Sequence, residues 1–248
     1  MIDLSNKIVF ITGGSKGIGE ACVKLFCEVH AKVIFTYNSD EEEAEKIQKA
    51  YGAADIYKMD VGSEDDVNYV VESIASKYGR VDILVNNAGI WEGNELEKIT
   101  LEQWERTQRT NLTGTFLVTK AIVPLMKKNK FGKIINISST ASQRGEAYYS
   151  LYAASKGGIN AFTKSLSTEL GPFGINVNAV APGWVMTPMT AKVFEDKKYL
   201  EQETNKIPLR RIATPEDIAG PVLFLASELS RNITGAVISA NGGSILCG

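Results

Sequence analysis

The chain has 248 residues, of which 44% are hydrophobic and 23% are charged, a composition typical of globular domains. Its net charge of -2 gives no electrostatic reason to expect nucleic acid or an anionic membrane as a partner. The only histidine, His30, argues against a histidine-based catalytic triad and a multi-histidine metal site, so we expect no metal.

Three further features concern the thiols, the location and the domain count. The cysteines, Cys22, Cys27 and Cys247, have no metal-type spacing and are interpreted as reduced thiols. No stretch is long and apolar enough to span a bilayer, and the amino terminus lacks a charged head followed by an apolar run. We therefore expect a cytoplasmic protein with one α/β domain over residues 1–248, without linker or repeat.

The first predicted strand runs into a glycine-rich turn. Residues 8–12 (Ile-Val-Phe-Ile-Thr) form a short apolar run typical of a buried parallel strand. Residues 13–19 (Gly-Gly-Ser-Lys-Gly-Ile-Gly) follow directly, and a helical pattern begins at Ala21. Such a turn lets backbone N–H groups approach a pyrophosphate at the positive end of the helix. Glycines also serve plain tight turns, but the strand–turn–helix order favours a nucleotide site.

The end of the second predicted strand, residues 32–37, bears on the choice of cofactor. An acidic residue there would bind the ribose 2′-hydroxyl of NAD. The last strand residue and the two that follow are uncharged: Tyr37, Asn38 and Ser39. With Lys16 available in the glycine turn as a counter-charge for a 2′-phosphate, the pattern favours NADP(H) over NAD(H). The acidic run 40–43 opposes this choice, but acids in the first turn of a helix suit its dipole.

Strands and helices continue to alternate through the first half of the chain. Residues 54–59 form a third strand, residues 63–78 an amphipathic helix, and residues 81–85 a fourth strand. The third strand ends at Asp60-Val61, and the fourth leads into 86–89 (Asn-Asn-Ala-Gly). That asparagine pair would either shape a ligand-binding turn or brace the sheet. The alternation predicts a Rossmann-type, doubly wound α/β sandwich of three layers.

The second half continues the same pattern. A long helix is predicted over 101–129, with Asn111 inside it and a kink at Pro124. Strands over 132–137, 175–180 and 235–240 and helices over 153–170 and from Thr214 complete the fold. The charged segment near 188–211 is predicted to cover the substrate, although an ordinary surface hairpin fits as well.

Tyr152 and Lys156 form the most informative pair. Helical spacing of four places the phenol and the ammonium on one face, and a nearby ammonium stabilises a phenolate. Taken alone, such a pair is also common on helix surfaces. Tyr148 and Tyr149 compete for the role by residue type, but only Tyr152 has a lysine four positions later. Ser138 and Ser139 lie at the carboxyl end of strand 132–137, where ligands bind in open α/β sheets.

The chain resembles the short-chain dehydrogenase/reductase family over essentially its whole length. Each motif is short, but the full set in order and at the right spacing is very specific. The family serine lies thirteen positions before the tyrosine, which selects Ser139 over Ser138. The matching positions are Thr12, Gly13, Gly17 and Gly19, Asn86 to Gly89, Asn111, Ser139, Tyr152 and Lys156, and Pro182, Gly183 and Thr187.

The resemblance implies a sheet of about seven parallel strands, a nicotinamide cofactor and usually a homotetramer. It implies that Ser139 binds the substrate carbonyl and that Tyr152 exchanges a proton with the developing alkoxide. Lys156 would bind the nicotinamide ribose and lower the pKa of Tyr152, and Asn111 would hold a water that links Lys156 to solvent.

The predicted cofactor contacts come from the strand ends and from the catalytic pair. They are Gly13, Ser15, Lys16, Gly17, Ile18, Gly19, Tyr37, Asn38, Ser39, Asp60, Val61, Asn87, Ala88, Gly89, Tyr152, Lys156, Pro182, Gly183, Val185 and Thr187.

Within the family, the chain looks closest to the 3-oxoacyl-acyl-carrier-protein reductases of fatty-acid synthesis. Lys16, the uncharged second-strand end and residues 207–211 (Ile-Pro-Leu-Arg-Arg) agree with that group. Phe173 departs from it, because those reductases commonly carry there an arginine that helps to dock the acidic carrier protein. Part of such a basic patch would come from Lys127, Lys128 and Lys130.

Two alternatives stay open from sequence. The first is an oxidoreductase of a free alcohol, sugar, ketone or quinone. The second is a catalytically silent dinucleotide sensor on the same fold. The complete set of Ser139, Tyr152, Lys156 and Asn111 argues against a sensor, which has no need of all four.

Overall fold

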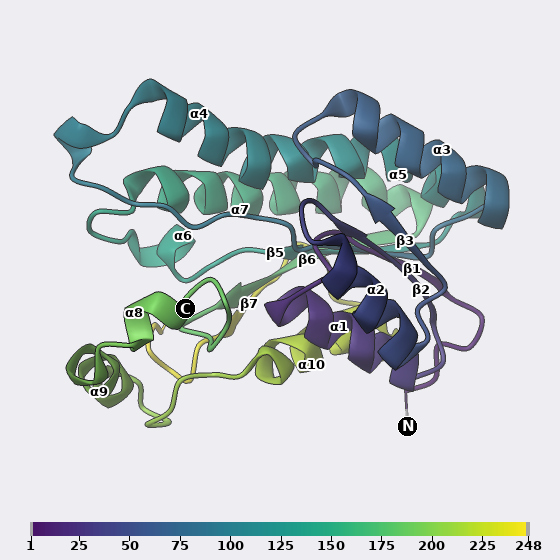
Figure 1. Cartoon of the computed structure of the whole chain (residues 1–248). Coiled ribbons are helices and arrows are strands. Elements are labelled where there is room, and N and C mark those ends of the chain that lie inside the picture. The colour runs from purple at the N-terminus through teal and green to yellow at the C-terminus, as the bar shows by residue number, and fades with distance from the viewer. Residues whose placement is uncertain (1, 247–248) are drawn as a thin grey trace.

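A seven-stranded parallel sheet organises the chain in the computed structural model, which describes residues 2–246 (Figure 1). The strand order is β3-β2-β1-β4-β5-β6-β7, so the chain fills one half of the sheet and then the other. This reversal puts the carboxyl ends of β1 and β4 at the switch point where open α/β sheets bind ligands. The strands are β1 (Ile8–Ile11), β2 (Lys32–Tyr37), β3 (Asp55–Lys58), β4 (Ile83–Asn86), β5 (Gly132–Ile137), β6 (Ile175–Pro182) and β7 (Val237–Ala240).

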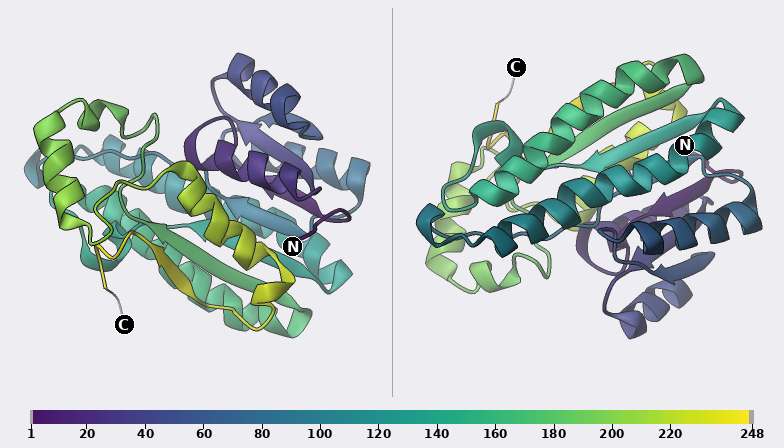
Figure 2. Two further views of the ribbon diagram at one scale, coloured as in Figure 1. Left: turned by 90° about the horizontal axis from the view of Figure 1, so that it is seen from below. Right: turned by 90° about the horizontal axis from the view of Figure 1, so that it is seen from above.

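Helices cover both faces of the sheet, which confirms the predicted three layers. One face carries α1, α2 and α10, and the other carries α3, α4, α5 and α7 (Figures 1 and 2). The short helices α6, α8 and α9 gather at one end of the molecule (Figure 1). The helices are α1 (Gly17–Glu28), α2 (Glu41–Tyr51), α3 (Glu64–Tyr78), α4 (Leu101–Gln108), α5 (Gly114–Asn129), α6 (Ala141–Arg144), α7 (Ser150–Leu170), α8 (Ala191–Phe194), α9 (Lys197–Lys206) and α10 (Pro215–Ala226). Short 3-10 turns span Leu96–Lys98, Gly171–Phe173 and Glu228–Ser230.

Strand β1 shows why the sheet is buried on both sides. Its side chains alternate, so that Val9 and Ile11 join the core beneath α1 and α10. Ile8 and Phe10 point the other way, into the core beneath α3 and α5. Since both faces of the sheet are covered by helices and need apolar side chains, the sequence of the strand is a continuous hydrophobic run, as predicted.

The predicted long helix over 101–129 is interrupted, and the interruption is not at Pro124. It divides into α4, a π-helical turn over Arg109–Thr113 and α5, which runs through Pro124 as one helix. The π turn contains Asn111, whose side chain bonds to the backbone of Ile90 outside the helix. Such turns are rare and frequently occur at functional sites.

Other boundaries differ by a few residues from the prediction. Helix α7 starts at Ser150 rather than 153, which places Tyr152 and Lys156 in the same helix, one turn apart. Strand β6 extends to Pro182, and β7 is confined to Val237–Ala240. No helix within residues 2–246 is long and apolar enough to cross a membrane.

The described cysteines are free thiols. Cys22 is fully buried in α1, and burial raises its pKa to about 12, so the side chain behaves as a small apolar group. Burial raises the pKa of Cys27 to about 11. The third predicted thiol, Cys247, lies outside the described residues.

Candidate active site

The glycine turn is held against β4 by a cluster of hydrogen bonds. The Thr12 hydroxyl accepts hydrogen bonds from the backbone N–H groups of Asn87 (3.0 Å) and Ala88 (3.1 Å). In return, the Asn87 amide donates to the carbonyls of Thr12 (3.0 Å) and Gly13 (2.9 Å). Gly13 has φ +67, in the left-handed region that favours glycine. These bonds tie the ends of β1 and β4 together and fix the shape of the turn.

The two asparagines after β4 have different structural roles. Asn86 is buried and donates to Thr119 Oγ1 and Asn136 Oδ1, both at 2.9 Å, so it braces the sheet. Asn87 shapes the glycine turn and also lines the cavity above it. Both of the alternatives left open by the sequence apply, one to each residue.

Gly19 has a packing role, and its predicted cofactor contact stays a prediction. It does not line the cavity, and a Cβ there would lie 2.1 Å from the carbonyl oxygen of Gly13. Real Cβ atoms do not approach an oxygen so closely, so α1 packs against the turn at this distance only with glycine present.

We expect Gly19→Ala to destabilise the protein by about 2 kcal/mol or more, because the added methyl forces the helix away from the turn. Urea denaturation measures this change in the free energy of unfolding. The matched control is Gly220→Ala in α10, where a Cβ meets no atom within 4 Å. The control should be neutral or slightly stabilising. Equal stability of the two variants would contradict the packing role.

A cavity of about 800 Å³ runs from the glycine turn to the start of α7. Its size and mixed lining are typical of a ligand site. Apart from Gly19, every predicted cofactor contact lines it: Gly13, Ser15, Lys16, Gly17, Ile18, Tyr37, Asn38, Ser39, Asp60, Val61, Asn87, Ala88, Gly89, Tyr152, Lys156, Pro182, Gly183, Val185 and Thr187. The fold thus collects residues from five strand ends around one space.

The acidic run after β2 serves mainly as a helix start. The Asp40 carboxylate accepts a hydrogen bond from the backbone N–H of Glu43 (3.1 Å) and caps α2. The acidic residues 41–43 occupy the first turn of that helix, where they suit its dipole. Lys16 is exposed at the rim of the cavity near this end.

Lys156 is buried beside Tyr152. Its ammonium donates to the carbonyl of Ile137 (2.8 Å) and lies 5.7 Å from the centre of the Tyr152 ring. Burial lowers the pKa of Lys156 to about 8. Burial also raises the pKa of Tyr152 to about 12, while hydrogen bonding with Ser139 acts in the lowering direction.

In the chain by itself, desolvation disfavours the charged form of each group, so it raises the pKa of the phenol and lowers that of the ammonium. A lowering of the Tyr152 pKa by Lys156 stays a prediction for the protein with its cofactor. At neutral pH Tyr152 holds its proton. The chain alone thus presents a half-buried, protonated phenol at the cavity, and this phenol can donate a proton.

The two serines after β5 have different surroundings. Ser138 is buried, and its hydroxyl donates to Ser142 Oγ (3.1 Å) and to the Lys156 carbonyl (3.3 Å). The Ser139 hydroxyl accepts from the backbone N–H of Ala141 (3.1 Å) and reaches Tyr152. Both serines border the cavity, and Ser139 is the one whose hydroxyl acts on the Tyr152 phenol.

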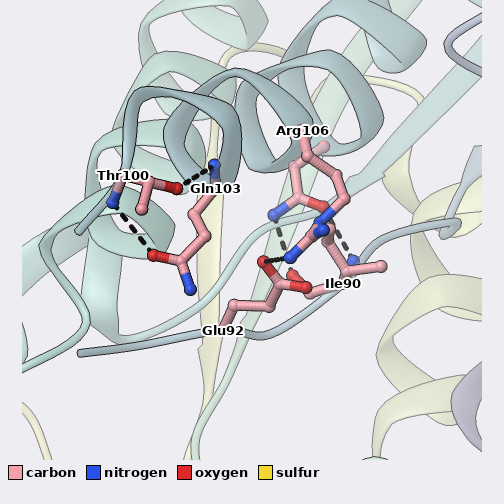
Figure 3. A network of polar contacts seen from close by, with 6 residues as sticks. Ile90, Glu92, Thr100, Gln103 and Arg106 are labelled. Atoms are coloured by element: carbon pink, nitrogen blue, oxygen red, sulfur yellow. Dashed lines mark hydrogen bonds and ion pairs between the residues drawn. The ribbon is translucent and has the colours of Figure 1, made fainter. Parts of the chain in front are cut away.

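Asn111 is fully buried and does not line the cavity. Its amide nitrogen donates to the carbonyl of Ile90 and to Ser155 Oγ, both at 3.0 Å. Its amide oxygen accepts from the Ile90 N–H at 2.8 Å. Both N–H groups of the amide are used, while its oxygen keeps a second lone pair, so the predicted water relay stays a prediction. The amide also ties the π turn to the segment after β4, which carries Glu92, paired with Arg106 at 2.9 Å (Figure 3).

Sequence reasoning missed an aromatic cluster at the substrate end of the cavity. Trp91 stacks on Tyr149 with ring centres 4.5 Å apart, and its centre lies 5.7 Å from that of Trp184. Two rings of the predicted cover also lie edge-on to Trp184. The ring centre of Phe194 is 5.3 Å from that of Trp184, and the ring centre of Tyr199 is 6.3 Å from it. Both tryptophans line the cavity, Trp91 in the loop after β4 and Trp184 in the loop after β6. Because ligands bind beyond the carboxyl ends of parallel strands, the aromatic residues of these loops could have been predicted from sequence to line the site.

The predicted cover segment lines the same end through α9 and the residues around it. Trp184 Nε1 donates to the buried Glu203 carboxylate at 2.9 Å. Met189, Lys206 and Ile207 also border the cavity.

Comparisons with known proteins agree with this geometry. A family profile described as enoyl-(acyl carrier protein) reductase matches residues 13–244. The chain is 41% identical over 98% of its length to the 3-oxoacyl-[acyl-carrier-protein] reductase FabG of Thermotoga maritima, covering 99% of that protein. It is 42% identical to the enzyme of that name from Aquifex aeolicus, with 98% of each chain covered.

Solved structures give the same result. The crystal structure of gox2181 superimposes with a TM-score of 0.93 at 33% identity, covering 98% of this chain and 96% of that one. A structure from Brucella melitensis titled short-chain dehydrogenase/reductase SDR:glucose/ribitol dehydrogenase gives a TM-score of 0.92 at 30% identity, covering 99% of each chain. The chain therefore belongs to the short-chain dehydrogenase/reductase family and is an NAD(P)-dependent oxidoreductase acting on carbonyl or hydroxyl groups.

Proposed function

We propose that the protein is an NADPH-dependent 3-oxoacyl-[acyl-carrier-protein] reductase. One observation carries the proposal: Ser139, Tyr152 and Lys156 meet at one end of the cavity whose other end is the glycine turn. The names of relatives about 40% identical over the whole chain support the substrate.

The proposed chemistry divides the work among these residues. When bound, the nicotinamide supplies or accepts the hydride. Ser139 donates a hydrogen bond that orients the carbonyl, and Tyr152 gives its proton to the developing alkoxide. Lys156 holds the nicotinamide ribose, and its positive charge favours the phenolate left behind. Asn111 acts through its bonds to Ile90 and Ser155 and positions the segment that follows β4.

The shape and chemistry of the cavity suit a dinucleotide. The glycine turn, with Gly13 in the left-handed region, borders the space at the start of α1, and a helix N-terminus favours a pyrophosphate. At the end of β2 the cavity is bordered by Tyr37, Asn38 and Ser39, and Lys16 of the glycine turn borders the same cavity. These groups fit a 2′-phosphate better than a bare 2′-hydroxyl, which supports NADP(H).

We expect Lys16→Ala to lower kcat/KM for NADPH about 5- to 30-fold and to leave that for NADH within about twofold, because one charge-assisted contact is lost. Initial rates at limiting cofactor measure both. Lys24→Ala, in α1 and away from the cavity, is the control. An equal loss for the two cofactors would contradict the assignment of Lys16 to the 2′-phosphate.

Docking of the carrier protein would use the face near α5. Phe173 is 40% exposed where the family resemblance implies an arginine. Lys127 lies with its ammonium 4.4 Å above that ring, which keeps a positive charge at this point of the surface. We propose that Lys127 takes the place of the missing arginine in binding an acidic carrier protein.

We also propose that the enzyme assembles as a homotetramer, which light scattering would test.

A free alcohol, sugar, ketone or quinone is the second candidate substrate. The aromatic wall of Trp91 and Trp184 favours it, because a flat or compact substrate would contact both rings. The decisive experiment follows cofactor absorbance with NADPH and NADH over carbonyl compounds that include a 3-oxoacyl thioester of acyl carrier protein. Turnover confined to free carbonyl compounds overturns the carrier-protein substrate. Cofactor binding without any turnover indicates a dinucleotide sensor.

A further inference from the structure

Glu146 is a carboxylate of the cavity to which the mechanism assigns no task. It lies between α6 and α7 and borders the same space as Ser139 and Tyr152. The side chain is half-buried, and burial raises its pKa. Its negative charge acts on the Tyr152 phenol and further raises the pKa of that group. Glu146 is therefore close enough to affect charges at the reacting end.

The other acidic side chains that border the cavity already have partners. Glu203 accepts from Trp184 (2.9 Å) and pairs with Lys206 (2.5 Å). Glu92 pairs with Arg106, as the close-up shows (Figure 3). At the other end, Asp60 pairs with Arg109 (2.7 Å) and Asp40 caps α2.

Glu146 differs from these carboxylates. Within residues 2–246 it has no hydrogen bond or ion pair through its side chain, and the exposed Arg144 acts on it only through space. Its carboxylate oxygens are thus available to a ligand.

The loop that carries Glu146 is fixed in place. Tyr148 adopts φ 69, an uncommon conformation for a non-glycine residue. Its carbonyl accepts a hydrogen bond from Asn94 (2.7 Å), and the next residue, Tyr149, stacks on Trp91. A Cβ at Gly93 would lie 2.4 Å from the Tyr149 ring, so the two loops are in close contact. These contacts hold Glu146 at the substrate end.

We propose that Glu146 selects the chemical form of the substrate: it accepts hydrogen bonds from an uncharged, donor-bearing thioester arm and repels the carboxylate of the free 3-oxo acid. The proposal rests on the proposed function. A free 3-oxo acid carries its carboxylate two carbons from the reacting carbonyl, so a carbonyl bound at Tyr152 brings that charge into the cavity with Glu146. A thioester replaces the charge with a neutral group and amide N–H donors. The like-charge contact thereby becomes a hydrogen bond.

The test compares reduction of acetoacetate with that of its methyl ester. The wild-type enzyme should favour the ester by about 10-fold or more in kcat/KM. Glu146→Gln should raise kcat/KM for acetoacetate by about 10-fold and change that for the ester by less than about threefold, because the amide keeps the shape and loses the charge. Glu92→Gln is the matched control, since Arg106 already neutralises that carboxylate. An ester-to-acid ratio unchanged by Glu146→Gln overturns the proposal.

Failure of the proposed function gives a different result. If the wild-type enzyme reduces neither 3-oxo compound, the 3-oxoacyl substrate is excluded. The role of Glu146 is then tested with 4-carboxybenzaldehyde and its methyl ester, by the ester-to-acid ratio of kcat/KM in the wild type and in Glu146→Gln. A ratio shifted by Glu146→Gln supports charge selection there, and an unshifted ratio, or reduction of none of the four compounds, overturns it.

Discussion

Replacing Tyr152 with phenylalanine should lower kcat by about 10³-fold, within the range for loss of a general acid, while cofactor affinity changes less than about threefold. The Tyr152 side chain is half-buried at the cavity, burial raises its pKa to about 12, and the nearby Ser139 hydroxyl acts in the lowering direction. The phenol therefore carries its proton at neutral pH, at the cavity where we propose that the carbonyl binds. Phenylalanine keeps the ring that packs beside Lys156 and removes only the donor.

Two measurements separate this effect from damage to the fold. Fluorescence titration reports cofactor binding, and steady-state rates report turnover. Tyr148→Phe is the matched control, because this neighbouring phenol is 67% exposed and outside the cavity lining. Its kcat should stay within about twofold of the wild type, as is usual for an exposed substitution. If Tyr152→Phe retains more than about a tenth of the activity, the proton comes from another group.

The features that sequence predicted well are those set by local pattern. The buried strands are continuous apolar runs, since both faces of the sheet meet helices, and the run in β1 divides between the two cores residue by residue. Helix starts were also visible, as at Ser63, whose hydroxyl accepts from the backbone N–H of Asp66 and caps α3. The Tyr152–Lys156 pair needed only helical spacing.

The features that sequence did not predict depend on contacts between distant segments. Gly19 matches a ligand motif, yet its role depends on the distance between a helix and the Gly13 carbonyl. The pKa of Tyr152 depends on how much water the fold removes, and the residue pair alone does not give this. The substrate end combines Trp91, Glu146 and Trp184 from three loops.

Lys156 has opposite effects on stability and function. The pKa of the buried lysine falls to about 8, from about 10.4 in an unfolded chain, so burying its charge costs about 3 kcal/mol at neutral pH. Below pH 8 the folded protein bears this cost in full. Between pH 8 and about 10.4 the folded lysine is neutral while the unfolded one still holds a proton, so stability rises with pH across this window.

Lys156→Met should therefore stabilise the cofactor-free protein at pH 7 by about 1 to 2 kcal/mol, after allowing about 1 kcal/mol for the lost hydrogen bond to Ile137. The gain should shrink as pH rises through the same window, and kcat should fall at least about 100-fold, since the charge that favours the phenolate is gone. Urea denaturation between pH 7 and 10 measures the change in stability.

Lys133→Met is the matched control, because Lys133 is also buried and its pKa is also lowered by burial. Its ammonium bonds to Asn176, away from the cavity. The control should keep full activity. Destabilisation by Lys156→Met at pH 7, or a gain independent of pH, would show that the buried charge is compensated within the fold and that Lys156 is not held there against a desolvation cost.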